Sequence, residues 1–183
     1  MRAVLDACVL FPPVMREMLL GAAALGGFAP VWSARILEEW ARATRRLPDG
    51  AEARARAEIA ALRERFPGAE VAVPEGLVAS LSLPDPDDCH VLAAAIAGGA
   101  GTLVTLNRTD FPTRTLARHG VLLREPDGFL VELLAEGLDL APVAEAARRG
   151  REAGVRTVLK RAGLPRLGKA LGAREGAEAG SGG

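Results

Sequence analysis

Five oxygen-bearing side chains in this sequence stand at positions where they could meet and do chemistry together. They are three aspartates, one glutamate and one asparagine: Asp6, Glu39, Asp88, Asn107 and Asp110. Clustered carboxylates repel one another, and proteins tolerate them where a divalent cation neutralises their charge. Because carboxylate and amide oxygens are hard ligands, they suit Mg²⁺ or Mn²⁺ better than zinc. The chemistry that such a group supports is metal-assisted hydrolysis.

Three of these side chains are expected at one edge of a parallel sheet. Asp6 lies in an apolar run over 2–11, which predicts a buried strand that continues into a loop. Asn107 and Asp110 follow a second apolar strand over 102–105. The working residues of open parallel sheets lie beyond the carboxyl ends of the strands. We therefore expect these three groups to converge there.

Two helices are expected to carry the other carboxylates to the same edge. Asp88 opens a predicted helix over 88–97. Ser33 is a good N-cap for a second helix over 34–46. Glu39 lies on the face of that helix that bears its apolar residues, so we expect its side chain to point at least partly inward.

The rest of the chain continues the alternation of strands and helices. Short strands are expected over 71–73 and 121–123, and helices over 14–25, 51–66, 75–80, 126–136 and 141–162. This rhythm predicts an α/β fold in which helices cover both faces of a central parallel sheet.

The length and composition limit the class of protein. A chain of 183 residues is one domain with room for an appended tail. No apolar run approaches the roughly 20 residues that a membrane-spanning helix needs. Asp6 falls inside what would be the apolar region of a signal peptide. We therefore expect a cytoplasmic protein without membrane contact.

Charge is unevenly distributed, although the formal net charge is zero. Residues 1–141 hold 14 Lys and Arg against 19 Asp and Glu, whereas residues 142–183 hold 9 against 4. We expect three parts: a globular domain over 1–135, a basic helical extension over 136–172 and a disordered tail over 173–183.

Four segments together resemble the PIN domain, and most closely the bacterial VapC-type toxins of toxin–antitoxin pairs. These segments are Val4–Leu10, Ser33–Trp40, Asp85–Ala95 and Val104–Pro112, in the order and approximate spacing of the family. The resemblance covers roughly residues 1–135. It implies a three-layer α/β/α sandwich and the activity of a metal-dependent endoribonuclease.

The resemblance also implies a role for each matching acid. Asp6 matches the first acid of the family and Asp88 the third, and both are expected to hold the principal Mg²⁺ or Mn²⁺ ion. Glu39 matches the helix acid and is expected to act through water or as a general base. Glu38 fits less well, because the acid in the family motif directly precedes an apolar residue, which here is Trp40.

The fourth acid departs from the family pattern. Asn107 occupies its usual position, where it can bind a metal or a water through its carbonyl but adds no charge. Asp110 becomes the candidate for the fourth carboxylate. This departure leaves open a second interpretation, in which the chain is a catalytically degenerate PIN domain that binds RNA or serves as a scaffold.

Simpler structural interpretations also remain at this stage. Asp88 could be only a helix N-cap, and Asp110 could be a turn residue. Cys8, Cys89 and His90 lie beside the acids and leave zinc as an alternative. Because there is no CxxC pair and no standard zinc spacing, packed cysteines and a structural histidine are the default expectation.

The partners follow from the resemblance and from the charge pattern. An acidic site repels RNA, so we expect phosphate contacts from the basic extension, including Arg148, Arg149 and Arg151. A toxin implies a cognate antitoxin that covers the acidic edge with a basic side chain. PIN domains commonly pair, and the apolar first helices are candidates for a homodimer contact.

Overall fold

The structure is a computed structural model that describes the backbone of residues 1–180 and the side chains of residues 1–174. It contains two compact units, which we describe separately. The first unit is formed by Met1–Phe11 and Phe28–Arg124. The second is formed by Pro12–Gly27 and by the chain from Glu125 onward.

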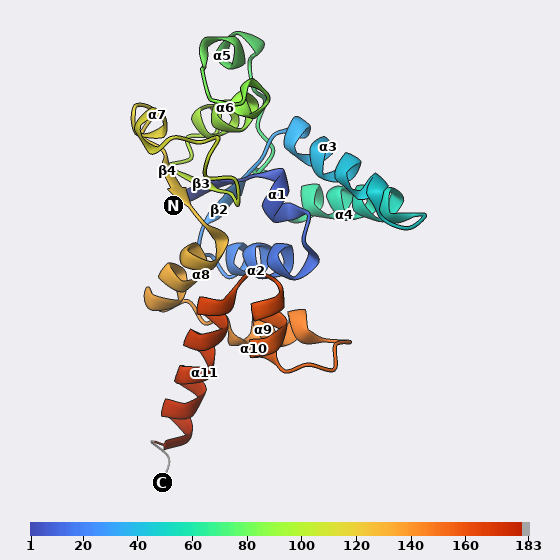
Figure 1. Ribbon diagram of the computed structural model, residues 1–183, viewed down its shortest axis with the longest axis vertical. Helices are drawn as coiled ribbons and strands as arrows, with labels where there is room; N and C mark the ends of the chain where they lie inside the picture. Colours follow the sequence, from blue (N-terminus) through green and yellow to red (C-terminus); the bar gives the residue numbers. More distant parts are fainter. Residues whose placement is uncertain (181–183) are drawn as a thin grey trace. The chain divides into compact units, whose positions relative to one another are not determined.

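A four-stranded parallel sheet forms the centre of the first unit (Figure 1). Its strands lie in the order β2-β1-β3-β4 and span Arg2–Leu5 (β1), Ala29–Val31 (β2), Thr102–Val104 (β3) and Leu122–Arg124 (β4). Ala3 is in register with Pro30 on one side and with Thr102 on the other. β1 and β3 are therefore neighbours, and their carboxyl ends meet at the same edge.

Helices surround this sheet in the first unit. They are α1 (Ala7–Leu10), α3 (Ala34–Ala43), α4 (Ala51–Arg65), α5 (Glu75–Ser80), α6 (Cys89–Ala97) and α7 (Thr113–Ala117), with the short 3-10 helices η1 (Thr44–Arg46) and η2 (Pro86–Asp88). The hydroxyl oxygen of Ser33 accepts a hydrogen bond from the Ile36 N–H at 3.3 Å, so it caps α3 as predicted.

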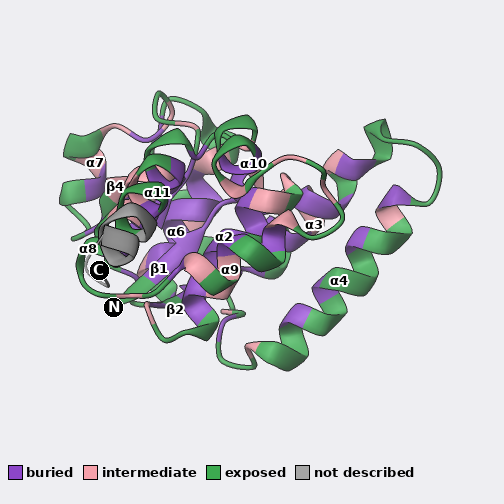
Figure 2. Cartoon of the chain, turned by 90° about the horizontal axis from the view of Figure 1, so that it is seen from below, coloured by how far each residue is buried: buried purple, intermediate pink, exposed green. Residues whose placement is uncertain are grey.

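The core of the first unit lies between the sheet and α6. Figure 2 shows buried residues concentrated on β1 and α6, whereas α4 is exposed along most of its length. Ala93 and Ala95 are fully buried in α6, which packs against β1 and β3. Gly98 ends this helix so close to β2 that a Cβ there would meet Val31 Cγ1 at 2.6 Å. Small residues are therefore needed where α6 approaches the sheet.

The second unit is helical. Its helices are α2 (Pro13–Ala24), α8 (Pro126–Ala135), α9 (Ala141–Arg148), α10 (Val155–Arg161) and α11 (Pro165–Gly180). The apolar residues of α2 pack against α8, α9 and α10. The carboxylate of Asp127 in α8 accepts hydrogen bonds from the backbone N–H groups of Arg166 and Leu167, both at 2.9 Å, so it caps the start of α11.

The α/β fold with a central parallel sheet is confirmed, but two strands differ from the prediction. The sequence did not predict β2, because Pro30 at its centre argues against a strand. β2 is an edge strand, where proline is tolerated. The strand expected over 71–73 is wrong: this segment has only an isolated bridge between Trp32 and Glu70 beside it.

Three longer segments also differ in their boundaries. The apolar run over 2–11 divides at Asp6 into β1 and α1. The helix predicted over 141–162 divides into α9 and α10, with a break at 149–154. α11 extends to Gly180, over residues where the sequence predicts a disordered tail, and the remainder of that predicted tail, 181–183, lies outside the described residues. None of the described helices has the length and apolar composition that a membrane span requires.

Candidate active site

Asp6 is anchored between the ends of two neighbouring strands. It follows β1 directly, and only 6% of its surface is exposed. Its Oδ2 accepts a hydrogen bond from the hydroxyl of Thr105 at 2.7 Å, and Thr105 follows β3. The thiol of Cys8 donates a second bond to the same oxygen at 3.2 Å. Side chains, rather than the local turn, therefore fix the position of this carboxylate.

The two cysteines act as hydrogen-bond donors in this site. Burial, together with the charge of Asp6, raises the pKa of the Cys8 thiol to about 12. Cys8 is therefore protonated at neutral pH in the metal-free protein. The buried thiol of Cys89 donates to the carbonyl of Leu81 at 3.7 Å. Neither cysteine belongs to the group of potential metal ligands found among the described residues, which consists of aspartates.

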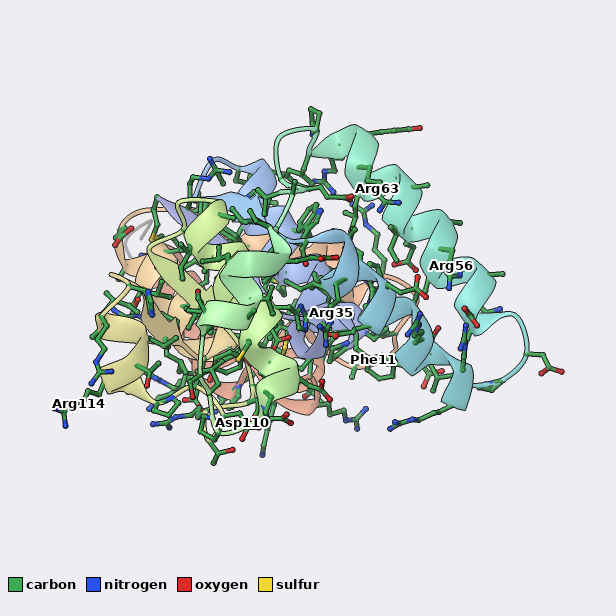
Figure 3. All side chains as sticks on the ribbon, turned by 90° about the horizontal axis from the view of Figure 1, so that it is seen from above. Phe11, Arg35, Arg56, Arg63, Asp110 and Arg114 are labelled. Atoms are coloured by element: carbon green, nitrogen blue, oxygen red, sulfur yellow. The ribbon has the colours of Figure 1, made fainter. Side chains whose placement is uncertain are left out.

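Three carboxylates gather at the same edge of the sheet. Oxygen atoms of Asp85, Asp88 and Asp110 all lie within 4.8 Å of one another, and they form the one such group of potential metal ligands found among the described residues. The side-chain nitrogen of Asn107 lies 3.2 Å from Asp88 Oδ2 and 2.5 Å from Asp110 Oδ2. Asp110 is labelled in Figure 3, at the loop that follows β3. We name Asp85, Asp88, Asn107 and Asp110 the acidic cluster.

Asp88 is the most perturbed member of the acidic cluster. Burial, followed by the negative charges of Asp6, Asp85 and Asp110, raises its pKa to about 6. Its carboxylate does not cap α6, so the interpretation of Asp88 as a simple N-cap is wrong. Asp85 provides the local cap instead, because its Oδ1 accepts a bond from the Asp87 N–H at 2.9 Å. A carboxylate held in such a field is stabilised by a bound cation.

Glu39 reaches the site from α3. Its Oε1 lies 2.9 Å from Nε2 of His90 on α6 and 3.1 Å from Nε of Arg35, one turn earlier on α3. Burial opposes ionisation of this group, but the bonds and charges of His90 and Arg35 outweigh it, and the net effect lowers the pKa of Glu39. Glu39 is therefore ionised at neutral pH and held by two donors.

The neighbouring Glu38 faces a different partner. Its carboxylate accepts bonds from Arg42 at 2.8 Å and from Arg56 at 2.9 Å, and these bonds lower its pKa to about 2. Figure 3 shows Arg56 on α4, on the side of α3 away from Asp110. The structure thus brings Glu39 to α6 and Glu38 to α4.

The three arginines expected to contact phosphate lie in the second unit. Arg148 is paired with Glu145 at 2.9 Å. Arg151 donates to the carbonyl of Ala147, and its guanidinium lies 3.9 Å from Glu17. Arg149 is exposed and forms no side-chain bond among the described residues. Two of the three arginines that were expected to contact phosphate therefore already have partners within the second unit.

Other residues of the site were not predicted from the sequence. Thr105 and Cys8 fix Asp6, and His90 fixes Glu39, all through contacts between segments far apart in the chain. The sequence could have predicted the contact of Arg35 with Glu39, because an arginine four residues before a glutamate on a helix forms an ion pair. The sequence could also have predicted Asp85 as a residue of the site, since it belongs to the same short acidic segment as Asp88.

The comparison with known families gives the class of the protein. The sequence model of the PIN domain matches residues 2–109, which is more than half of the chain. The chain belongs to the PIN domain family, whose members are generally nucleases. Neither the curated proteins nor the solved structures contain a significant match to it.

Proposed function

We propose that this protein is a divalent-metal-dependent endoribonuclease that acts as the toxin of a type II toxin–antitoxin pair. The observation that carries the nuclease assignment is the acidic cluster. Its carboxylates lie within 4.8 Å of one another, at the carboxyl edge of a parallel sheet in a PIN domain.

The donor set of the acidic cluster suits a hard divalent ion. Asp85, Asp88 and Asp110 each offer a ligand atom for Mg²⁺ or Mn²⁺. Asp6, which the sequence predicts as a ligand together with Asp88, lies outside this group of three, although its negative charge helps to raise the pKa of Asp88. The ion supplies activation of a water molecule and neutralisation of charge on the phosphodiester. Thr105 and Cys8 hold Asp6 in place, because both donate hydrogen bonds to its Oδ2.

In this proposal Glu39 does not act as the general base. A general base works best when its pKa lies near the working pH, and the two donors on Glu39 lower its pKa instead. We therefore assign it the role of holding a water molecule beside the acidic cluster. His90 and Arg35 fix its orientation.

RNA phosphates would be bound by the second unit. Arg149, Arg156 and Lys160 are exposed, and no described acid forms an ion pair with them. Arg156 and Lys160 lie one turn apart on α10 and present their charges on one face. These cations supply the phosphate affinity that an acidic site lacks.

The toxin assignment brings further partners. A cognate antitoxin would place a basic side chain on the acidic cluster, since charge complementarity favours this contact. A homodimer would use a surface other than the apolar face of α2, because Met18, Leu19 and Ala22 are buried within the second unit. We propose that the protein works in the cytoplasm, where RNA and a newly made antitoxin are present.

The experiment that tests the proposal is cleavage of single-stranded RNA by the purified protein. Cleavage is expected with Mg²⁺ or Mn²⁺, and it should stop with EDTA or in Asp6→Asn. Expression without an antitoxin should also arrest bacterial growth. A folded wild-type protein that cleaves no RNA under any of these conditions would contradict the nuclease assignment.

One observation favours the alternative of a degenerate PIN domain. The amide of Asn107 bonds to both Asp88 and Asp110, at the position where the family usually has a carboxylate. In that case the protein would bind RNA without cleaving it. Metal-independent RNA binding, together with harmless expression, would support this second candidate.

A further inference from the structure

A second feature of the first unit lies next to the acidic cluster. It is a cavity of about 560 Å³ between the start of α3, the segment 71–79 and α6. Its walls are largely apolar and include Val71, Val73 and Val78. This volume lies in the range of small-molecule sites, which are about 300–1,000 Å³. The proposed mechanism does not use this cavity.

Two buried polar groups line the cavity. Only 3% of the surface of His90 is exposed, and its Nε2 lies 2.9 Å from Glu39, while its Nδ1 has no hydrogen-bond partner among the described residues. Nδ1 of the imidazole can bond a further group, as a donor when the ring is charged and as an acceptor when it is neutral. The hydroxyl oxygen of Ser33 accepts the cap bond from Ile36, which leaves its hydrogen available as a donor. Buried polar groups without partners are uncommon and call for an explanation.

Two residues that line the cavity also hold Glu39, and one of them bonds to the segment that carries Asp88. His90 and Arg35 both line the cavity, and both bond to Glu39. Arg35 also donates to the carbonyl of Asp87 at 3.3 Å, and Asp87 directly precedes Asp88. A group in the cavity would therefore lie beside a phosphodiester bound at the acidic cluster.

We propose that this cavity holds an unpaired nucleobase of the RNA, next to the phosphodiester that is cleaved. The inference rests on the proposed ribonuclease function and deepens it. A base has flat apolar faces, which the valines would contact, and a polar edge, which would meet His90 Nδ1 and the Ser33 hydroxyl. The half-exposed guanidinium of Arg35 can stack on a base or contact a phosphate. An apolar side chain of a protein partner would leave Nδ1 of His90 without a partner.

The first test uses the RNA rather than the protein. Cleavage products of a randomised single-stranded RNA are sequenced, and the base preference at each nucleotide beside the cleaved bond is measured. A clear preference is expected at one of these positions. A single abasic nucleotide at that position should lower kcat/KM by about tenfold or more.

A matched pair of variants locates this preference in the cavity. Ala79 is exposed and lines the cavity, so Ala79→Phe fills the space without disturbing the core. It should remove the base preference and leave cleavage of the abasic RNA at the wild-type rate. Ala60→Phe makes the same change at an exposed position on α4 and should keep the preference.

The outcomes separate this inference from the function on which it rests. Metal-dependent cleavage without any base preference beside the cleaved bond would overturn the nucleobase site and leave the nuclease assignment intact. The absence of all cleavage would overturn both. If Ala79→Phe kept the base preference but no longer bound a co-expressed antitoxin, the cavity would belong to the protein partner, and the inference would be wrong.

Discussion

The side-chain amide of Asn107 donates a hydrogen bond to Oδ2 of Asp110 at 2.5 Å. The same nitrogen lies 3.2 Å from Asp88 Oδ2, so one neutral amide joins two carboxylates. A carboxylate at position 107 would add a negative charge between them instead. Asn107 therefore stabilises the metal-free cluster and reduces the charge that is available to bind a cation.

Asn107→Asp is expected to increase metal affinity at a cost in stability. The added charge should tighten Mn²⁺ binding by about tenfold, which corresponds to about 1.4 kcal/mol. Repulsion should lower the melting temperature of the metal-free protein by about 2–4 °C for each kcal/mol of stability that the change removes. Calorimetric titration with Mn²⁺ and thermal melts in EDTA measure these two effects. Unchanged Mn²⁺ affinity would argue against a metal at the acidic cluster.

The raised pKa of Asp88 predicts a pH dependence of stability. Between the ordinary pKa of 3.8 and the folded-state value of about 6, the folded protein binds more protons at Asp88 than the unfolded chain does. The free energy of unfolding should therefore fall as the pH rises through this window. Because Asp88 is only half-buried, solvent screening limits the expected change to about 1 kcal/mol.

Urea unfolding in EDTA at about pH 4.5 and about pH 7 checks this dependence. The comparison is between the wild type and Asp88→Asn, because other carboxylates titrate in the same range. Relative to the wild type, the variant should gain stability at the higher pH. An identical pH dependence in the two proteins would show that Asp88 titrates normally. Added Mn²⁺ should stabilise the wild type at the higher pH and leave the variant unchanged.

Glu39 and Glu38 provide a matched pair of substitutions on α3. Glu39→Gln weakens the bonds to His90 and Arg35 beside the acidic cluster, and it should lower kcat/KM for RNA cleavage by about 10- to 100-fold. Glu38→Gln changes only exposed ion pairs to Arg42 and Arg56, so cleavage should persist. Steady-state kinetics of RNA cleavage by both variants measure this difference in kcat/KM. An equal loss in both variants would indicate a general effect on α3.

Charge reversal on α10 tests the proposed phosphate-binding residues. Arg156→Glu with Lys160→Glu should weaken binding to unrelated single-stranded RNAs. It should also flatten the plot of log affinity against log salt by about 0.7 for each phosphate that the variant no longer neutralises. These positions are better suited than Arg148 and Arg151, which already have partners.

The control for this prediction changes charge by the same amount in the first unit. Arg46→Glu with Arg54→Glu alters two exposed arginines there. RNA affinity and salt dependence are measured by fluorescence anisotropy for both double variants. If the control variant bound RNA equally weakly, the change in net charge alone would explain the effect. If the α10 variant bound RNA as tightly as the wild type, Arg156 and Lys160 would not belong to the binding surface.

Local patterns predicted much of the fold and part of the site. The Ser33 cap is a property of a short segment, and the structure has it as predicted. The apolar run over 2–11 predicted the first strand, although the structure ends that strand at Leu5. β2 could not be predicted, because pairing with β1 overrides the effect of Pro30. A strand is defined by its neighbours, and a single segment does not reveal them.

The acids of the site could be predicted from the sequence, whereas the residues that hold them in place could not. Family resemblance pointed to Asp88 and Asp110, and the structure brings their oxygens together. The bond between His90 and Glu39 joins α6 to α3, and the bond between Thr105 and Asp6 joins two strand ends. Such bonds depend on the tertiary fold, so periodicity and spacing carry no signal for them.

The most direct test of the account is the rate of RNA cleavage as a function of Mn²⁺ concentration, measured for the wild type and Asp88→Asn. The account predicts a saturable rise in the wild type. In the variant it predicts a loss of about 100-fold or more, while the metal-free variant melts at or above the temperature of the metal-free wild type. Equal cleavage by the two proteins at every Mn²⁺ concentration would contradict a metal-dependent nuclease site at the acidic cluster.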